Sequence, residues 1–183
     1  MIDGAMQPFA LTLDQFLEHA AKWRPRGEVV TARTGGVDRI GYADLKDRSQ
    51  RASAVLHDLG VRTGDRVATL AWNTQAHVEV WYAIMGMGAV CHTLNPRLTP
   101  AQLAGMVQRS GARIMIVSAD LIPLARQVAE TVATVERVLV IDGPAEGADD
   151  KFTALEPLIE GMQARWTWGG FDETAPCGLC FTS

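Results

Sequence analysis

Residues 66–117, RVATLAWNTQAHVEVWYAIMGMGAVCHTLNPRLTPAQLAGMVQRSGARIMIV, decide the fold. Three apolar runs, at 66–71, 89–94 and 113–117, show almost no alternation, which is typical of strands buried on both faces of a parallel sheet. Helical patterns lie between them. The best-specified helix start is Thr99-Pro100-Ala-Gln102, a capping box with Pro at the first helical position. Strands that alternate with helices predict an α/β domain, mostly a parallel sheet flanked by helices.

The same alternation continues on both sides of this stretch. We expect further elements as follows: a helix from a capping box at Thr12 to Gln15 that ends before Pro25, a β-hairpin of 29–33 and 39–42 around Gly35-Gly36, a helix over 43–59, a helix over 75–87 capped by Asn73, a helix over 121–133, a strand at 137–141, a loop at 142–150, a helix over 152–162, an irregular Trp-rich stretch at 166–172 and a last strand at 178–182.

The composition describes a globular chain with about one domain's worth of core. Of the 183 residues, 48% are apolar and 21% are charged, which excludes disorder. Seventeen basic against twenty-one acidic side chains give a net charge of −4, so the totals show no footprint for nucleic acid or an anionic membrane. Three cysteines favour a reducing compartment, by default the cytoplasm. The most apolar run, 80–91, is too short for a transmembrane segment, and no secretory signal begins the chain.

Several motifs invite a chemical interpretation. Cys177-Gly-Leu-Cys180 lacks the second ligand pair that zinc needs and enters a strand, so we expect no metal or redox role. His92, at the end of a buried strand, is either near a ligand crevice or, as we favour, a core histidine with a satisfied hydrogen bond. Arg97 precedes a helix N-terminus, where it either binds phosphate or ties down its own loop.

Other features weigh against a dinucleotide-binding enzyme and an aromatic ligand site. No complete G-x-G-x-x-G or G-x-x-x-x-G-K-[ST] fingerprint is present in the sequence. Trp72, Trp81 and Met85 occur at helical spacing, and such a stripe usually packs a core. We therefore expect these three side chains to be core residues.

Residues 59–103 closely resemble the AMP-forming acyl-CoA synthetases, the adenylate-forming superfamily. The resemblance rests on Gly64-Asp-Arg-Val67, Trp72-Asn73, the Gly-Met-Gly-Ala helix end and Asn95-Pro96-Arg97-Leu98 in family order, and it extends over essentially the whole chain. Within the family the sequence is most similar to bacterial medium- and long-chain fatty-acid–CoA ligases and methylthio-alkanoate–CoA ligases.

The resemblance implies a ligase that activates a carboxylic acid with Mg·ATP to an acyl-adenylate and then transfers the acyl group to CoA. Thr182 and Ser183 would begin the Gly-rich loop that holds the ATP phosphates, and Arg97 matches a position that can approach the CoA phosphates. In the family the rest of this loop, the nucleotide-binding segments and the C-terminal domain with its catalytic Lys come later. The abrupt apolar end at Thr182-Ser183 therefore indicates an N-terminal fragment, expected to be inactive and to contain no catalytic or metal-binding residue.

This interpretation divides the chain into an N-terminal helix and hairpin (1–42), an α/β core (43–141) and a loop, helix and strand that lead into the phosphate loop (142–183). A fatty or other carboxylic acid is the expected substrate of the parent, and no nucleic acid or membrane-spanning segment is expected. Two alternatives remain open. The fragment is either an interaction module, since family members form homodimers through the N-terminal region, or a stand-alone flavodoxin-like nucleotide binder.

Overall fold

A six-stranded, wholly parallel sheet forms the centre of the protein. The computed structural model describes residues 10–147 and 149–181. The strand order is β7-β6-β5-β3-β4-β8, and the strands are β3 (Arg66–Leu70), β4 (Val90–Thr93), β5 (Ile114–Ser118), β6 (Arg137–Ile141), β7 (Phe152–Ala154) and β8 (Gly178–Leu179). The α/β prediction is confirmed.

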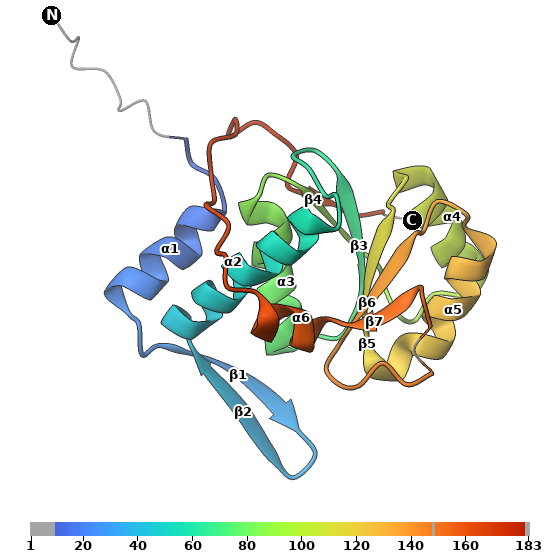
Figure 1. Ribbon diagram of the computed structural model, residues 1–183, viewed down its shortest axis with the longest axis horizontal. Helices are drawn as coiled ribbons and strands as arrows, with labels where there is room; N and C mark the ends of the chain where they lie inside the picture. The colour runs from blue at the N-terminus through green and yellow to red at the C-terminus, as the bar shows by residue number, and fades with distance from the viewer. Residues whose placement is uncertain (1–9, 148, 182–183) are drawn as a thin grey trace, which may run out of the picture.

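Helices cover both faces of this sheet (Figure 1). On one face α2 (Tyr42–Asp58), α3 (Gln75–Gly86) and α6 (Leu155–Gly161) bury a core with Val67, Cys91 and Ile116. On the other face α4 (Pro100–Ser110) and α5 (Ile122–Thr131), which follows a short 3₁₀ turn, bury a second core with Ala68 and Met115. Successive strand residues thus enter different cores, which explains why the strands lack polar alternation.

The N-terminal part lies beside this sandwich. Helix α1 (Asp14–Trp23) packs on α2 through Leu17, which contacts a small cluster with Leu45 and Trp168. The hairpin of β1 (Glu28–Arg33) and β2 (Gly36–Gly41) pairs antiparallel with Val29 opposite Ile40, and Gly35 adopts φ +85° in its turn. The hairpin projects away from α1 and α2 (Figure 1). The predicted helix and hairpin are both confirmed.

Two predicted helix caps are wrong and one is right. Helix α1 begins at Asp14 without a side-chain cap, because the Gln15 side chain donates to the Ala10 carbonyl and does not reach back to Thr12. Helix α3 is capped by Thr74, whose hydroxyl accepts from the His77 amide, so the prediction of Asn73 was one residue early. The capping box of Thr99 and Gln102 in α4 is present.

The C-terminal elements differ most from the prediction. Phe152–Ala154 is an edge strand that pairs with β6, whereas a helix was expected from residue 152. The Phe152 ring is drawn into the core under α5, and a helix begins only after it. The last strand is short, and residue 182 of its expected span lies outside the described residues.

Candidate functional site

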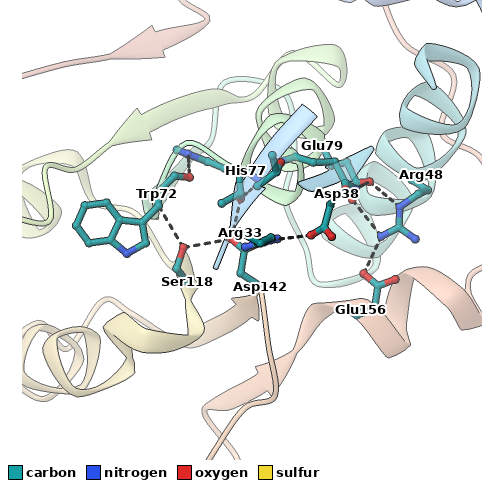
Figure 2. A network of polar contacts seen from close by, with 12 residues as sticks. Arg33, Asp38, Arg48, Trp72, His77, Glu79, Ser118, Asp142 and Glu156 are labelled. Atoms are coloured by element: carbon teal, nitrogen blue, oxygen red, sulfur yellow. Dashed lines mark hydrogen bonds and ion pairs between the residues drawn. The ribbon is translucent and has the colours of Figure 1, made fainter. Parts of the chain in front are cut away.

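The strand order singles out one crevice at the carboxyl edge of the sheet. From β3 the chain continues to β4 on one side and then crosses to β5 on the other, the order of flavodoxin-like proteins, whose ligands bind between these two strand ends. Here that position is occupied by protein groups. The Trp72 amide donates to Ser118 Oγ (3.2 Å), and Ser118 and Thr74 both donate to Asp142 (3.4 and 2.7 Å; Figure 2). This geometry weighs against the flavodoxin-like alternative.

Asp142 anchors the hairpin to this edge. Its backbone has φ 63°, the one positive value at a non-glycine position among the described residues. Its carboxylate accepts from Arg33 Nη2 (2.9 Å), and Arg33 also contacts Asp38 of the hairpin. Hydrogen bonds to Asp38 and Asp142 raise the pKa of Arg33. A strained residue held by this many partners serves here to fix the hairpin against the sheet.

A second ion-pair group lies beside it. Glu79, on α3 and almost fully buried, accepts from Arg48 of α2 (2.6 Å) and from Gln75, and Arg48 also contacts Glu156 of α6 (2.7 Å; Figure 2). Burial raises the pKa of Glu79, and Arg48 opposes that rise. Burial lowers the pKa of Arg48, but its two glutamate partners raise it overall.

These two groups line a cleft with a volume of about 970 Å³ between the hairpin, α3 and α6. Arg33, Arg39 and Arg48 on its walls are each in an ion pair. A cleft whose cations are already neutralised offers little to an anionic ligand. We interpret its polar groups as a scaffold that joins three elements.

The second cleft, about 620 Å³, lies between the hairpin, α3 and the end of β4. A cavity of this size suits a small-molecule ligand. Trp72 and Trp81 line it with 41% and 42% of their surface exposed, so the prediction that they are core residues is wrong. Met85, at 3%, is a core residue as predicted. Trp81 lies on α3, but Trp72 lies before that helix begins, so the two do not form one helical stripe. The spacing of aromatic residues does not distinguish a cleft wall from a core, which is why the prediction was wrong.

Arg97 lines this second cleft. The residue is exposed, and its guanidinium forms no ion pair or hydrogen bond within residues 10–147 and 149–181. The loop is held instead by its backbone, since the Arg97 amide donates to Asn95 Oδ1 (3.0 Å), and the N-terminus of α4 follows directly. Among the described residues, the guanidinium therefore does not tie down its own loop.

His77 is a cleft residue that the sequence did not single out. Its Nδ1 lies 3.1 Å from the Trp72 carbonyl and its Nε2 lies 3.1 Å from Thr69 Oγ1. Burial lowers the pKa of this imidazole. A neutral ring with both nitrogens engaged orients the Trp72 loop at the cleft wall. Only the meeting of α3 with β3 creates this pairing, so no local signal could have found it.

His92 is completely buried. It lies on the face of β4 opposite to Cys91, on the side of the sheet that α4 and α5 cover. The core placement is as predicted, but the expected hydrogen bond is not found: neither ring nitrogen has a partner in the described part of the chain. The Phe181 ring packs at 5.3 Å, and burial lowers the pKa of His92 to about 4.

Cys177 and Cys180 flank the short strand β8. Extended chain rises about 3.3 Å per residue, which separates these two Cα atoms by about 10 Å. A disulfide needs less than about 7 Å, so the extended conformation of β8 holds these two thiols too far apart for a disulfide. Within the described ranges, no group of His, Cys, Asp and Glu could hold a metal ion.

Strand β8 leads toward the second cleft. Cys180 Sγ lies 3.2 Å from Oγ1 of Thr93, and Thr93 lines the cleft together with Arg97. Thr182 and Ser183, the expected first residues of the phosphate loop, follow immediately in sequence and lie outside the described residues. The last described residues of the chain therefore contact Thr93 on the wall of the cleft that Arg97 also lines.

Comparisons with known proteins identify the family of the chain. The family model described as AMP-binding enzyme matches residues 17–183. The chain is 33% identical to 3-methylmercaptopropionyl-CoA ligase of Ruegeria lacuscaerulensis and 37% identical to a long-chain-fatty-acid–CoA ligase of Thermus thermophilus, each over 98% of its length. It spans only 34% and 32% of those relatives.

Solved structures show the same fold. The anthranilate CoA ligase AuaEII in complex with anthranoyl-AMP superimposes with a TM-score of 0.84 at 19% identity, over 96% of this chain and 32% of that one. The N-terminal domain of FACL13 from Mycobacterium tuberculosis gives 0.80 at 22% identity, over 94% and 42%. No helix in the described ranges is long and apolar enough to cross a membrane.

Proposed function

Because the chain belongs to the family of AMP-binding enzymes, we propose that it is the N-terminal part of an acid–thiol ligase, an AMP-forming fatty-acid–CoA ligase of the cytoplasm. The parent would activate a carboxylic acid with ATP, release pyrophosphate, and transfer the acyl group from the adenylate to CoA. The observation that supports this proposal is a single cleft lined by Arg97 and Thr93. The Arg97 guanidinium has no ion pair among the described residues, and Thr93 contacts Cys180 just after β8.

Each proposed site residue has a distinct role in this scheme. The hydroxyl and amide groups of Thr182 and Ser183 would hold ATP phosphate oxygens, and Arg97 would neutralise a phosphate of CoA. Mg²⁺ bound with ATP would offset further phosphate charge. No group of side chains in the described ranges suits this ion, so we assign it no ligand in this chain. His77 would position the Trp72 loop and take no part in the displacement.

Titration of the chain with CoA tests the proposed cleft. Two of the five tryptophans line it, so binding would change the intrinsic fluorescence in a saturable way. We expect Arg97→Glu to weaken the titration at least tenfold, because it replaces an attractive charge with a repulsive one. Arg109→Glu on α4, also exposed, is the matched control and should bind CoA as the unsubstituted chain does. An equal loss of CoA affinity in both variants would mean that the change in net charge causes it, and would contradict a CoA site at Arg97.

We also propose that the 183-residue chain alone does not catalyse ATP–pyrophosphate exchange with any fatty acid. The family resemblance assigns the remainder of the phosphate loop and the catalytic Lys to later segments, and the chain spans about a third of its relatives. Exchange above background with this chain would contradict the proposal.

A dimerisation role is the second candidate. The observation that favours it is the hairpin, a two-stranded sheet on which Val30 and Val37 are exposed. Paired hairpins would bury both valines and the free strand edges. Light scattering over a range of concentrations tests this: a dimer that Val37→Lys dissociates would support it, and a monomer at high concentration would exclude it.

A further inference from the structure

Helix α1 has a second apolar side that is exposed in the described part of the chain. Its inner side packs through Leu17, which is only 3% exposed. Phe16 and Trp23 are 66% and 64% exposed, and Leu11 just before the helix is 75% exposed. Figure 1 shows α1 at the periphery of the molecule, with α2 on one side only.

The exposed rings of the helix lie along one side of it. Phe16, His19 and Trp23 are spaced three and seven residues apart and therefore project from the same side of a helix. The His19 and Trp23 rings lie 6.4 Å apart, and Lys22 Nζ lies 5.1 Å from the Trp23 ring centre. We call Leu11, Phe16, His19 and Trp23 the α1 stripe.

Three exposed cations border the Trp23 end of this stripe, namely Lys22, Arg24 and Arg26. None of them forms an ion pair with another residue in the ranges 10–147 and 149–181. The acids nearest in sequence already have partners: Glu18 pairs with Lys46, and Glu28 pairs with Arg39. The patch is thus locally positive, although the whole chain carries a net charge of −4.

We propose that the α1 stripe docks on the interface of an anionic lipid bilayer. Tryptophan and cationic side chains are the residues that anchor helices lying in the membrane plane, with the rings at headgroup depth and the charges facing anionic lipids. Helix α1 is about 15 Å long, from 1.5 Å per residue. A single short helix of this kind gives reversible binding.

A second copy of the chain is a poorer occupant of this surface. In a twofold contact each stripe would meet itself, so the unpaired cations of the two copies would approach one another. An anionic lipid surface instead neutralises them. The inference does not depend on the proposed ligase activity, and its test requires no nucleotide or CoA.

Co-sedimentation with vesicles tests the proposal. The chain should bind phosphatidylcholine vesicles that contain phosphatidylglycerol, and binding to phosphatidylcholine alone should be at least tenfold weaker. Reversal of two charges in Lys22→Glu/Arg24→Glu should reduce binding at least tenfold, since cations near an anionic lipid surface are attracted to it and acids are repelled. Phe16→Ser/Trp23→Ser should also reduce binding. Added salt should weaken binding by the parent chain.

Matched controls use exposed residues elsewhere on the chain. Arg109→Glu and Gln108→Ser, both at exposed positions of α4, should bind as the unsubstituted chain does, and circular dichroism should show that all variants are folded. Absence of binding to the anionic vesicles overturns the proposal, and so does binding that the stripe variants leave unchanged. A concentration-dependent dimer that the Phe16→Ser/Trp23→Ser variant dissociates, without vesicle binding, assigns the surface to a second copy.

Discussion

His92 is the residue whose burial is least compensated. A buried polar group without a hydrogen bond costs stability, and an imidazole additionally resists protonation there. Its position between Ala68 of β3 and Leu179 of β8, with Phe181 against the ring, explains why its pKa falls to about 4. The protein therefore keeps this side chain neutral over a wide pH range.

This burial predicts a loss of stability in acid. The unfolded chain takes up the His92 proton below about pH 6.5, whereas the folded chain does so only near pH 4. Stability is therefore lost as the pH falls through this window, by up to about 3 kcal/mol. Denaturant titrations from pH 7 to pH 4 measure the free energy of unfolding. It should decline less with falling pH in His92→Gln than in the unsubstituted chain. Parallel curves would refute the assignment.

Gly86 and Gly105 form a matched pair of helical glycines. A Cβ at Gly86 would lie 2.6 Å from the Trp168 indole, whereas a Cβ at Gly105 would meet nothing within 4 Å. We expect Gly86→Ala to destabilise the fold by about 1–3 kcal/mol through overpacking. Gly105→Ala should stabilise it by about 0.5–1 kcal/mol. Chemical denaturation of the two variants measures both signs, and destabilisation by Gly105→Ala would contradict the packing argument.

At the scale of elements, the start of a helix depends on whether its local capping hydrogen bonds form in the folded protein. Thr99 and Gln102 satisfy one another's backbone at the start of α4, as the capping-box spacing predicts. Thr12 and Gln15 have the same spacing, yet Gln15 bonds elsewhere. The Leu11 amide there donates to Glu173, a contact over 162 residues that no local pattern encodes.

The two threonines allow a direct comparison of cap strength. Thr99→Ala should lower stability by about 1 kcal/mol, since it removes the acceptor for the Gln102 amide. Thr12→Ala should cost less, because the Thr12 side chain caps no helix in the described structure. Thermal unfolding of both variants measures the difference, and an equal loss would mean that the Thr99 bond contributes little.

At the scale of the whole molecule, an ion pair and a hydrogen bond join the hairpin to the α/β sandwich. Arg33 reaches Asp142 across 109 residues, and Thr31 of β1 accepts from the Gln75 amide at the start of α3. The hairpin contributes a wall to both clefts. Loss of this attachment would therefore change the clefts without unfolding either core.

Hydrogen exchange can detect such partial opening. Arg33→Met should raise amide exchange in β1 and β2 about fivefold, because a partly exposed ion pair contributes about 1 kcal/mol. The amides of β3 and β5 should be unaffected. Arg39→Met is the matched control, since Arg39 pairs with Glu28 inside the hairpin. Equally faster amide exchange in both variants would mean that contacts within the hairpin cause it. That result would contradict a role of the Arg33–Asp142 ion pair in attaching the hairpin.

The sequence by itself determined the parallel α/β sheet, the hairpin, the strong cap of α4 and the resemblance to a ligase family, because buried strands, turn glycines and capping boxes are local patterns. It also identified Arg97 as a candidate anion-binding residue, since a cation before a helix N-terminus is visible in the chain. It did not determine that Trp72 and Trp81 line a cleft, that Phe152 forms a strand, or that His77 and Asp142 fix the walls. Each of these depends on which surface another element covers, and only the tertiary structure decides that.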